Sequence, residues 1–233
     1  LLLDPALRVL GAFPLGDGEA AMAALRDALA APAPEPWAPV AAIPNVLEPE
    51  LCAELIRRYE AHGGEESGFM RDVGGKTRLL VDPGHKQRRD WIIDDEPLKR
   101  ALVVRLNRRM TVPIERAFQF RPTRIERYLV ACYAAGAGHF RPHRDNTTKG
   151  TAHRKFAVTV NLNAGDYDGG DLRFPEYGNR TYRAPTGGAI VFSCSLLHEA
   201  TPVTRGKRYA FLPFLYDEEA ARLREANNPH LGE

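Results

Sequence analysis

The second half of the chain is divided into many short extended segments, and this division restricts the possible fold more than any other feature. Between residues 124 and 215, runs of aliphatic, aromatic and β-branched residues alternate with turn signals rich in glycine, proline and aspartate. Several short strands at this spacing are typical of an all-β sandwich or barrel. The expected strands cover residues 124–133, 155–163, 171–175, 180–183, 188–193, 198–203 and 207–215.

Helices are expected mainly outside this strand region. Apolar residues at helical spacing, with capping or breaking residues at the ends, mark each of them. Pro113 is expected to interrupt the third helix, because proline lacks the backbone N–H that a helix interior uses. Residues 64–90 should form loops and short strands, and residues 1–13 a short buried strand, a turn and a second strand. The expected helices cover residues 17–31, 49–63, 97–118 and 217–227.

A proline-rich stretch separates the chain into two parts. Residues 32–39 contain four prolines, a composition that prevents regular hydrogen bonding and is typical of a stiff linker. We therefore expect an N-terminal appendage at residues 1–31, a linker at 32–39 and a main domain at 40–233. The chain opens at Leu1 in what resembles the middle of a domain, so we expect a fragment of a longer protein.

Composition excludes several classes of protein. With 233 residues, 44% hydrophobic and 27% charged, the chain is not a disordered segment, a collagen-like repeat or a disulfide-stapled mini-protein. No apolar run approaches the roughly 18 residues that cross a bilayer, so no membrane partner is expected. The net charge of +2 disfavours a general nucleic-acid binder. Three scattered cysteines favour a reducing compartment, which predicts a cytoplasmic location.

Three residues in the strand region form a candidate metal site. His143 and Asp145 lie two apart, so in an extended segment their side chains point the same way. His198 follows 55 residues later, after another expected strand. Two imidazoles and one carboxylate are the facial set of non-haem Fe(II) oxygenases. Taken singly, His143 could instead be a loop histidine paired with Asp145, and His198 a core histidine bonded to a backbone carbonyl.

Arg208 adds a cation ten residues after His198, on the next expected strand. There it could face the same interior and hold a carboxylate through its planar fork. The alternative is a surface arginine in a basic turn with Arg205 and Lys207. The apolar residues that follow it, at 209–212, favour burial.

With these residues in order, the sequence resembles the prolyl 4-hydroxylase-like branch of the Fe(II)/2-oxoglutarate-dependent dioxygenases. The resemblance implies a mainly β fold with flanking helices around a double-stranded β-helix, or jelly-roll, core. The matching stretches are CYAAGAGHFRPHRD at 132–145, FAVTVNLNAGDYDGGDLRF at 156–174 and GGAIVFSCSLLHEATPVTRGKRYAF at 187–211.

The resemblance also implies roles for single residues. His143, Asp145 and His198 would be the catalytic metal ligands that hold Fe(II). Arg208 would bind the distal carboxylate of 2-oxoglutarate, and Tyr133 would assist it, with Tyr128 as the alternative tyrosine. The implied reaction uses O2 and 2-oxoglutarate to hydroxylate an aliphatic C–H bond, and it releases succinate and CO2. L-Ascorbate is an accessory cofactor that the resemblance implies.

The expected substrate is a peptide side chain of prolyl type or a small molecule. Basic residues surround the expected site. Their favoured explanation is a solvated face that attracts 2-oxoglutarate, and the alternative explanation is an acidic substrate. A nucleic-acid substrate is disfavoured, because the DNA-alkylation-repair dioxygenases carry a second arginine where this chain has Phe214. Residues 64–90 and 146–154 are expected to form the walls of the pocket. Nothing in the sequence indicates a homo-oligomeric state.

Other hypotheses remain open at this point. The main alternative is a non-enzymatic, metal-binding jelly roll, such as a cupin-like sensor or interaction module. A zinc hydrolase is a third hypothesis, although no general-base carboxylate accompanies the metal residues. The N-terminal residues 1–31 resemble the tail of a thioredoxin-like or peroxiredoxin-like domain, and an ordinary strand–helix appendage is the alternative.

Overall fold

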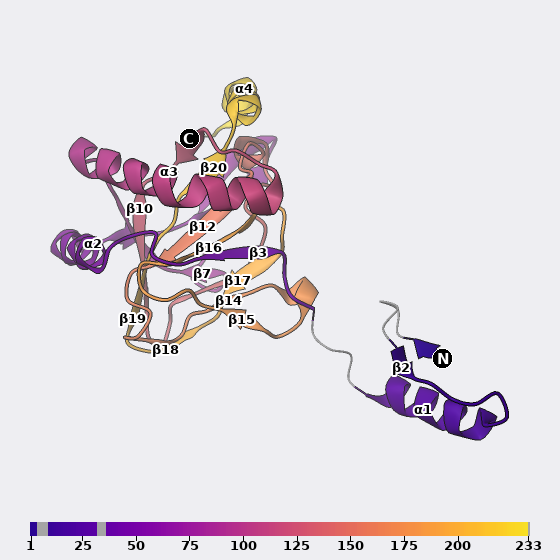
Figure 1. The fold of residues 1–233 in the computed structure, drawn as a ribbon. Helices are drawn as coiled ribbons and strands as arrows, with labels where there is room; N and C mark the ends of the chain where they lie inside the picture. The colour runs from indigo at the N-terminus through magenta and orange to yellow at the C-terminus, as the bar shows by residue number, and fades with distance from the viewer. Residues whose placement is uncertain (4–8, 32–35, 233) are drawn as a thin grey trace. The chain divides into compact units, whose positions relative to one another are not determined.

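The computed structural model describes residues 1–3, 9–31 and 36–232, and the chain divides into two compact units, Leu1–Pro36 and Trp37–Glu233 (Figure 1). Part of the predicted linker, residues 32–35, and the predicted turn at 4–8 lie outside the described residues. The remaining linker residues, 36–39, form neither helix nor strand. Within the described ranges, no helix combines the length and the apolar character needed to cross a membrane.

In its described residues, 1–3, 9–31 and 36, the smaller unit contains two short strands and one helix. Strands β1 (Leu2–Leu3) and β2 (Val9–Gly11) are antiparallel, and α1 covers Gly18–Ala30. Asp17 caps the helix by accepting a hydrogen bond from the backbone N–H of Ala20 at 3.4 Å. The prediction of a buried first strand is wrong, since Leu3 is exposed. A two-stranded ribbon is too small to bury the side chains on both of its faces.

The larger unit is built on two main antiparallel sheets, which confirms the mainly β prediction (Figure 1). The nine-stranded sheet contains β3 (Val40–Ile43), β4 (Glu65–Glu66), β8 (Arg89–Ile92), β9 (Arg124–Glu126), β10 (Leu129–Ala134), β12 (Phe156–Asn161), β16 (Ala189–Ser193), β19 (Lys207–Phe211) and β20 (Phe214–Tyr216). The five-stranded sheet contains β7 (Lys86–Gln87), β11 (His139–His143), β14 (Leu172–Arg173), β15 (Thr181–Tyr182) and β17 (His198–Ala200). Two ribbons complete the fold, β5 (Phe69–Val73) with β6 (Lys76–Leu80) and β13 (Asp168–Gly169) with β18 (Val203–Arg205).

Three helices accompany these sheets, α2 (Pro49–His62), α3 (Glu96–Phe118) and α4 (Glu218–Asn227). Helix α3 buries a residue at every fourth position, from Leu98 to Ile114, in the same core cluster as Val130 and Val191 of the large sheet. This spacing places the buried side chains along one stripe of the helix. The stripe fixes the helix on the sheet face that points away from the small sheet (Figure 1).

The expected interruption of α3 at Pro113 is not found, because the helix continues through it to Phe118. Proline removes one helical hydrogen bond, but its neighbours Met110 and Ile114 are both buried against the large sheet. Packing on both sides of the proline therefore keeps the last turn and a half helical.

The expected strand 124–133 is divided, because Arg127 takes a left-handed conformation with φ of 62°. Strand β9 before it pairs with β20, while β10 after it pairs with β8 and β19. The predicted strand 207–215 is also divided, into β19 and β20. Strict alternation along the sequence does not reveal such a kink, because each half keeps its own period of two.

Strand β10 is buried on both faces, so it contributes side chains both to the core under α3 and to the space between the two sheets. Val130 and Cys132 belong to the cluster under α3. Leu129, Ala131 and Tyr133 point the other way, into a second cluster between the sheets. The alternation of a strand therefore directs Tyr133 away from the helices and into the cavity described below.

Candidate metal centre

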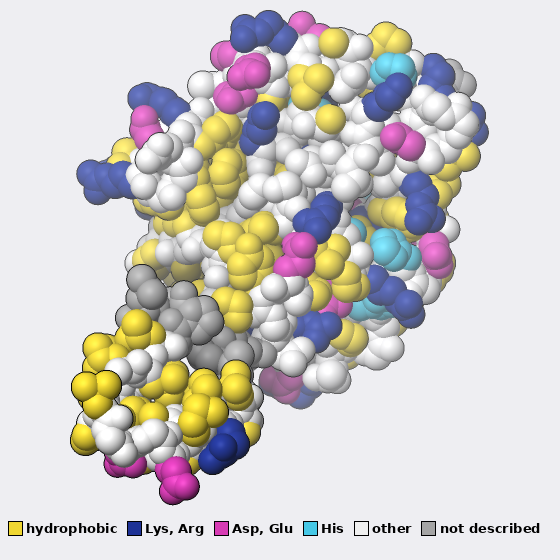
Figure 2. All heavy atoms as spheres, turned by 90° about the vertical axis from the view of Figure 1, so that its right-hand side faces the viewer, with side chains coloured by type: hydrophobic (Ala, Val, Ile, Leu, Met, Phe, Trp, Pro, Cys, Tyr) yellow, Lys and Arg dark blue, Asp and Glu magenta, His cyan; other side chains and the backbone are white. Residues whose placement is uncertain are grey.

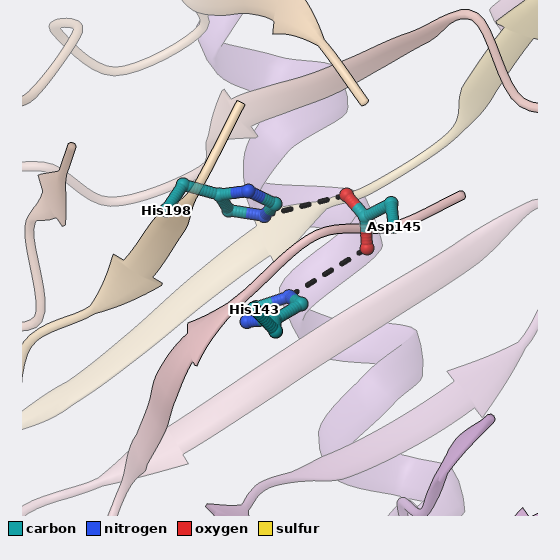
Figure 3. A group of neighbouring side chains, drawn as sticks. All are labelled: His143, Asp145 and His198. Atoms are coloured by element: carbon teal, nitrogen blue, oxygen red, sulfur yellow. Dashed lines mark ion pairs between the residues drawn. The ribbon is translucent and has the colours of Figure 1, made fainter. Parts of the chain in front are cut away.

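The structure brings His143, Asp145 and His198 together between two neighbouring strands (Figure 3). His143 ends β11, His198 begins β17, and the two histidines are register partners. Partners on antiparallel strands point to the same face of a sheet, which places both imidazoles side by side. Asp145 follows β11 and is held by its backbone N–H, which donates to the carbonyl of Cys194 at 3.0 Å.

The ligating atoms of the three side chains converge. One atom from each residue lies within 4.8 Å of the other two. The Nε2 atom of His198 is 3.3 Å from Oδ2 of Asp145, and Nε2 of His143 is 3.6 Å from Oδ1 (Figure 3). Such a group is compact enough for each residue to offer one ligand to a common ion.

Backbone carbonyls fix the tautomer of both histidines. Nδ1 of His143 lies 2.8 Å from the carbonyl oxygen of Arg141, and Nδ1 of His198 lies 3.0 Å from that of Leu196. A carbonyl can only accept, so each Nδ1 carries the proton and each Nε2 keeps its lone pair. This outer hydrogen bond is the usual support of a metal-ligating histidine.

Burial and neighbouring charges keep His143 and Asp145 in the protonation states that metal binding requires. Burial, reinforced by the proximity of His198, lowers the pKa of His143 to about 4. Burial alone would raise the pKa of Asp145, but the two histidines outweigh it and hold that pKa well below its usual range. A neutral imidazole beside an ionised carboxylate fits the donor set of an Fe(II) centre.

Aromatic side chains surround the two histidines. The ring of Phe140 stacks on His143 with centroids 3.4 Å apart, and Phe192 packs edge-on against His198 at 4.6 Å. Packing of this kind restricts ring rotation and keeps water from the far side of each imidazole. The ligating edges therefore face only the cavity.

The three side chains line a cavity of about 710 Å³. Its walls include residues of 68–88 and of 147–154, in agreement with the walls expected from the sequence. Its lining contains more cationic side chains than carboxylates, and the carboxylates are Asp72, Glu126 and Asp145. On the face of the larger unit drawn in Figure 2, histidine side chains are bordered by lysine or arginine side chains.

Arg208 lies inside this cavity and not in a surface turn. It is 2% exposed, and its Nε atom has no hydrogen-bond partner. Its guanidinium carbon lies 5.1 Å from the ring centroid of Tyr133, its register partner on β10. Tyr133 is buried and lines the same cavity, whereas the alternative tyrosine, Tyr128, lines a separate cavity under α3.

Sequence reasoning missed a polar network that supports Tyr133. Arg88 donates to the hydroxyl of Tyr133 at 3.1 Å and forms an ion pair with Asp90 at 2.7 Å. Lys86, also buried, donates to Ser67 Oγ at 2.6 Å. The Arg-x-Asp spacing was the available signal, since residues two apart on a strand point to one face.

Residues 128–216 match the family model of the 2OG-Fe(II) oxygenase superfamily. A PKHD-type hydroxylase from Synechococcus sp. (strain JA-2-3B'a(2-13)) is 38% identical over 96 residues, which cover 39% of this chain and 42% of that protein. A PKHD-type hydroxylase from Stutzerimonas stutzeri (strain A1501) is 29% identical over 142 residues, covering 56% of this chain and 62% of that protein. The chain thus spans less than two thirds of either relative.

Solved structures share the fold. A Pseudomonas putida prolyl-4-hydroxylase superimposes with a TM-score of 0.57 at 17% identity, covering 77% of this chain and 92% of that one. A Trichoplax adhaerens prolyl hydroxylase, in complex with a hypoxia inducible factor peptide fragment, gives 0.56 at 19% identity, covering 79% and 86%. The two main sheets are therefore the predicted double-stranded β-helix. Residues 128–216 of the larger unit are thus similar in sequence to the 2OG-Fe(II) oxygenase superfamily, and the larger unit is similar in fold to solved prolyl hydroxylases.

Proposed function

We propose that the protein is an Fe(II)- and 2-oxoglutarate-dependent dioxygenase. It hydroxylates an aliphatic C–H bond of a peptide side chain, of prolyl type, or of a small molecule, with release of succinate and CO2. The observation that carries this proposal is the convergence of His143, Asp145 and His198 in the same cavity as the buried Arg208. A metal set and a carboxylate-binding cation in one chamber are what this chemistry requires.

His143, Asp145 and His198 are the proposed iron ligands. When bound there, Fe(II) with 2-oxoglutarate and O2 supplies the oxidant for C–H hydroxylation. The protein holds both imidazoles with Nε2 toward the ion, through the carbonyls of Arg141 and Leu196. Phe140 and Phe192 exclude water from the outer side of the rings.

Arg208 and Tyr133 are the proposed binding residues for 2-oxoglutarate. Arg208 is a buried cation, and no carboxylate in the described part of the chain pairs with it. A carboxylate ligand would offset the cost of burying that charge. The hydroxyl oxygen of Tyr133 accepts from Arg88, so its own proton is free to be donated to a carboxylate.

The proposed substrate is a peptide, because a structural neighbour is a prolyl hydroxylase seen in complex with a peptide fragment. An acidic peptide is favoured by the excess of cations in the cavity lining. Ascorbate is proposed as an accessory reductant. A cytoplasmic location is supported by three buried cysteines, Cys52, Cys132 and Cys194, which are all free thiols.

The test is succinate formation from 2-oxoglutarate by the Fe(II)-loaded protein, with and without ascorbate. His143→Ala and His198→Ala should abolish turnover. His139→Ala is the matched control, because His139 lies on the same strand and has the same Nδ1 contact with a carbonyl, 2.7 Å from that of Ala137, but is not part of the metal group. Turnover that survives in both ligand variants would refute the proposal.

The family match and the buried Arg208 favour the enzyme over a cupin-like sensor without activity. A sensor would bind metal without any dependence on 2-oxoglutarate. Calorimetric titration of the Mn(II)-loaded protein with 2-oxoglutarate separates the two functions, since only the enzyme should bind the cosubstrate in a metal-dependent manner.

A further inference from the structure

Three of the six arginines in the cavity lining are neutralised by a carboxylate of the protein itself. Such a pair satisfies both partners and leaves little charge for a ligand. The paired arginines are Arg88 with Asp90 at 2.7 Å, Arg144 with Glu176 at 2.8 Å and Arg154 with Glu126 at 2.6 Å.

Arg127 is different, because it lines the same cavity without such a partner. Its Nε atom is buried and has no hydrogen bond, and no carboxylate of the described ranges forms an ion pair with it. Its guanidinium carbon lies over the ring of Phe214, 4.4 Å from the centroid. The polar edge of Arg127 is thus left free for a ligand.

Holding Arg127 in this state costs the protein stability. Its backbone has φ of 62°, a left-handed conformation that is unfavourable for a residue other than glycine. Burial and the nearby cations Arg154 and Arg88 lower its pKa to about 10, so its charge is destabilised where it stands. Strain and an uncompensated charge at one residue are typical of a functional position.

Arg127 is also separated from the residue proposed for 2-oxoglutarate. Tyr133 and Arg208 are register partners, and Arg127 precedes Tyr133 by six residues, while Phe214 follows Arg208 by six. Arg208 packs on Tyr133 and Arg127 packs on Phe214, so the two guanidinium groups are held at different aromatic rings.

The neighbour of Arg127 connects it to the metal centre. Arg154 packs on the same ring, 4.2 Å from the centroid of Phe214, and donates to the backbone carbonyl of Asp145 at 3.4 Å. A ligand bound at Arg127 therefore lies beside the segment that carries one of the proposed iron ligands. A substrate has to be anchored close to this segment for its C–H bond to reach the metal site.

We propose that Arg127 binds a carboxylate of the substrate, which makes the substrate a peptide with an acidic residue close to the hydroxylated one. This inference rests on the proposed function. The planar fork of an arginine, here packed over Phe214, matches the two oxygens of a carboxylate, and the bound anion supplies a charge partner for Arg127.

The test uses the Mn(II)-loaded protein with saturating 2-oxoglutarate, so that Arg208 is occupied and no turnover occurs. An equimolar pool of proline-containing peptides, identical except for Glu, Gln or Lys beside the proline, is passed over the immobilised protein, and retention is measured by mass spectrometry. Glu peptides should be retained about tenfold more than their Gln counterparts. Arg127→Gln should remove the preference, and Arg127→Glu should shift it to the Lys peptides.

Arg124→Gln is the matched control, because Arg124 is an exposed arginine three residues earlier that is paired with Glu218 at 2.9 Å. It should keep the preference for Glu. Equal retention of Glu and Gln peptides by the wild type, or an unchanged preference in Arg127→Gln, would overturn the inference. Loss of 2-oxoglutarate binding in Arg127→Gln would overturn it too, by assigning Arg127 to the cosubstrate.

Melting temperature distinguishes a ligand-binding role from a structural one. Arg127→Gln should melt no lower than the wild type, whereas Arg154→Gln, which leaves Glu126 with His153 as its one remaining ion-pair partner, should melt lower. An equal fall in both variants would assign Arg127 a structural role and refute the inference. Failure of the proposed function would show separately, as an absence of succinate formation by the wild type, because the retention assay needs no turnover.

Discussion

Tyr133 and Arg208 are paired across β10 and β19, and the guanidinium of Arg208 packs over the tyrosine ring at 5.1 Å. A second guanidinium, that of Arg88, lies 5.6 Å from the same ring and donates to its hydroxyl. The tyrosine is thus held between two arginines of which one is neutralised by Asp90 and the other is not. This asymmetry leaves Arg208 as the charge available to a dicarboxylate.

Arg208→Ala should raise the KM for 2-oxoglutarate by about 100-fold, because a fully buried charge-assisted pair is lost. Arg208→Lys should raise it less, since the ammonium keeps the charge but lacks the planar fork. The measurement is succinate formation as a function of 2-oxoglutarate concentration at fixed Fe(II). An unchanged KM in Arg208→Ala would show that the cosubstrate is bound elsewhere.

Arg88→Met should lower the free energy of unfolding by about 3–5 kcal/mol, because it leaves the buried carboxylate of Asp90 without its partner. Urea denaturation measures this loss. The double variant with Asp90→Asn should recover much of it, since the stranded charge is removed. Arg57→Gln, which breaks an exposed pair with Glu54, is the control and should change little.

The sequence predicted which segments form helices and strands better than it predicted where each helix or strand continues or breaks. Helix α3 passes through Pro113 because Met110 and Ile114 are anchored on the sheet, and this tertiary packing is not visible in a local pattern. The kink at Arg127 was missed because arginine rarely takes positive φ, so no glycine or asparagine marked it. Both misses come from long-range packing that overrides local preference.

Pro113→Ala should raise the free energy of unfolding by about 2 kcal/mol. The alanine supplies the backbone donor that the carbonyl of Arg109 lacks in the present helix. The unfolded chain also gains conformational entropy when the proline is replaced, and this offsets part of the stabilisation. Thermal unfolding followed by circular dichroism measures the change. A lower melting temperature would mean that the proline ring makes packing contacts worth more than the hydrogen bond.

The candidate site was easier to predict than the network behind it. His143, Asp145 and His198 carry distinctive residue types at a distinctive spacing, and the structure places them within bonding reach of one point. Lys86 and Arg88 looked like part of a charged loop, because lysine and arginine are far more often exposed than buried. Only the folded chain shows that β7 and β8 bring both of them to the wall of the cavity.

Lys86 predicts a pH dependence of stability whose sign follows from its burial. Burial, with repulsion from Arg88, lowers the pKa of Lys86 to about 6 from an ordinary value of 10.5. Between these two values the unfolded chain binds the proton and the folded chain does not, so stability rises with pH by up to about 1.4 kcal/mol per pH unit. The cost of burying the lysine is complete below about pH 6 and disappears toward pH 10.5.

Lys86→Met should therefore be more stable than the wild type at pH 7, and this advantage should shrink steadily as the pH is raised toward 10. Urea denaturation of the metal-free protein at a series of pH values gives the difference directly. Lys149→Met, the same substitution at an exposed lysine, controls for the loss of one positive charge. An advantage that stays constant over this range would show that Lys86 remains protonated in the folded protein, with the hydrogen bond to Ser67 compensating for its burial.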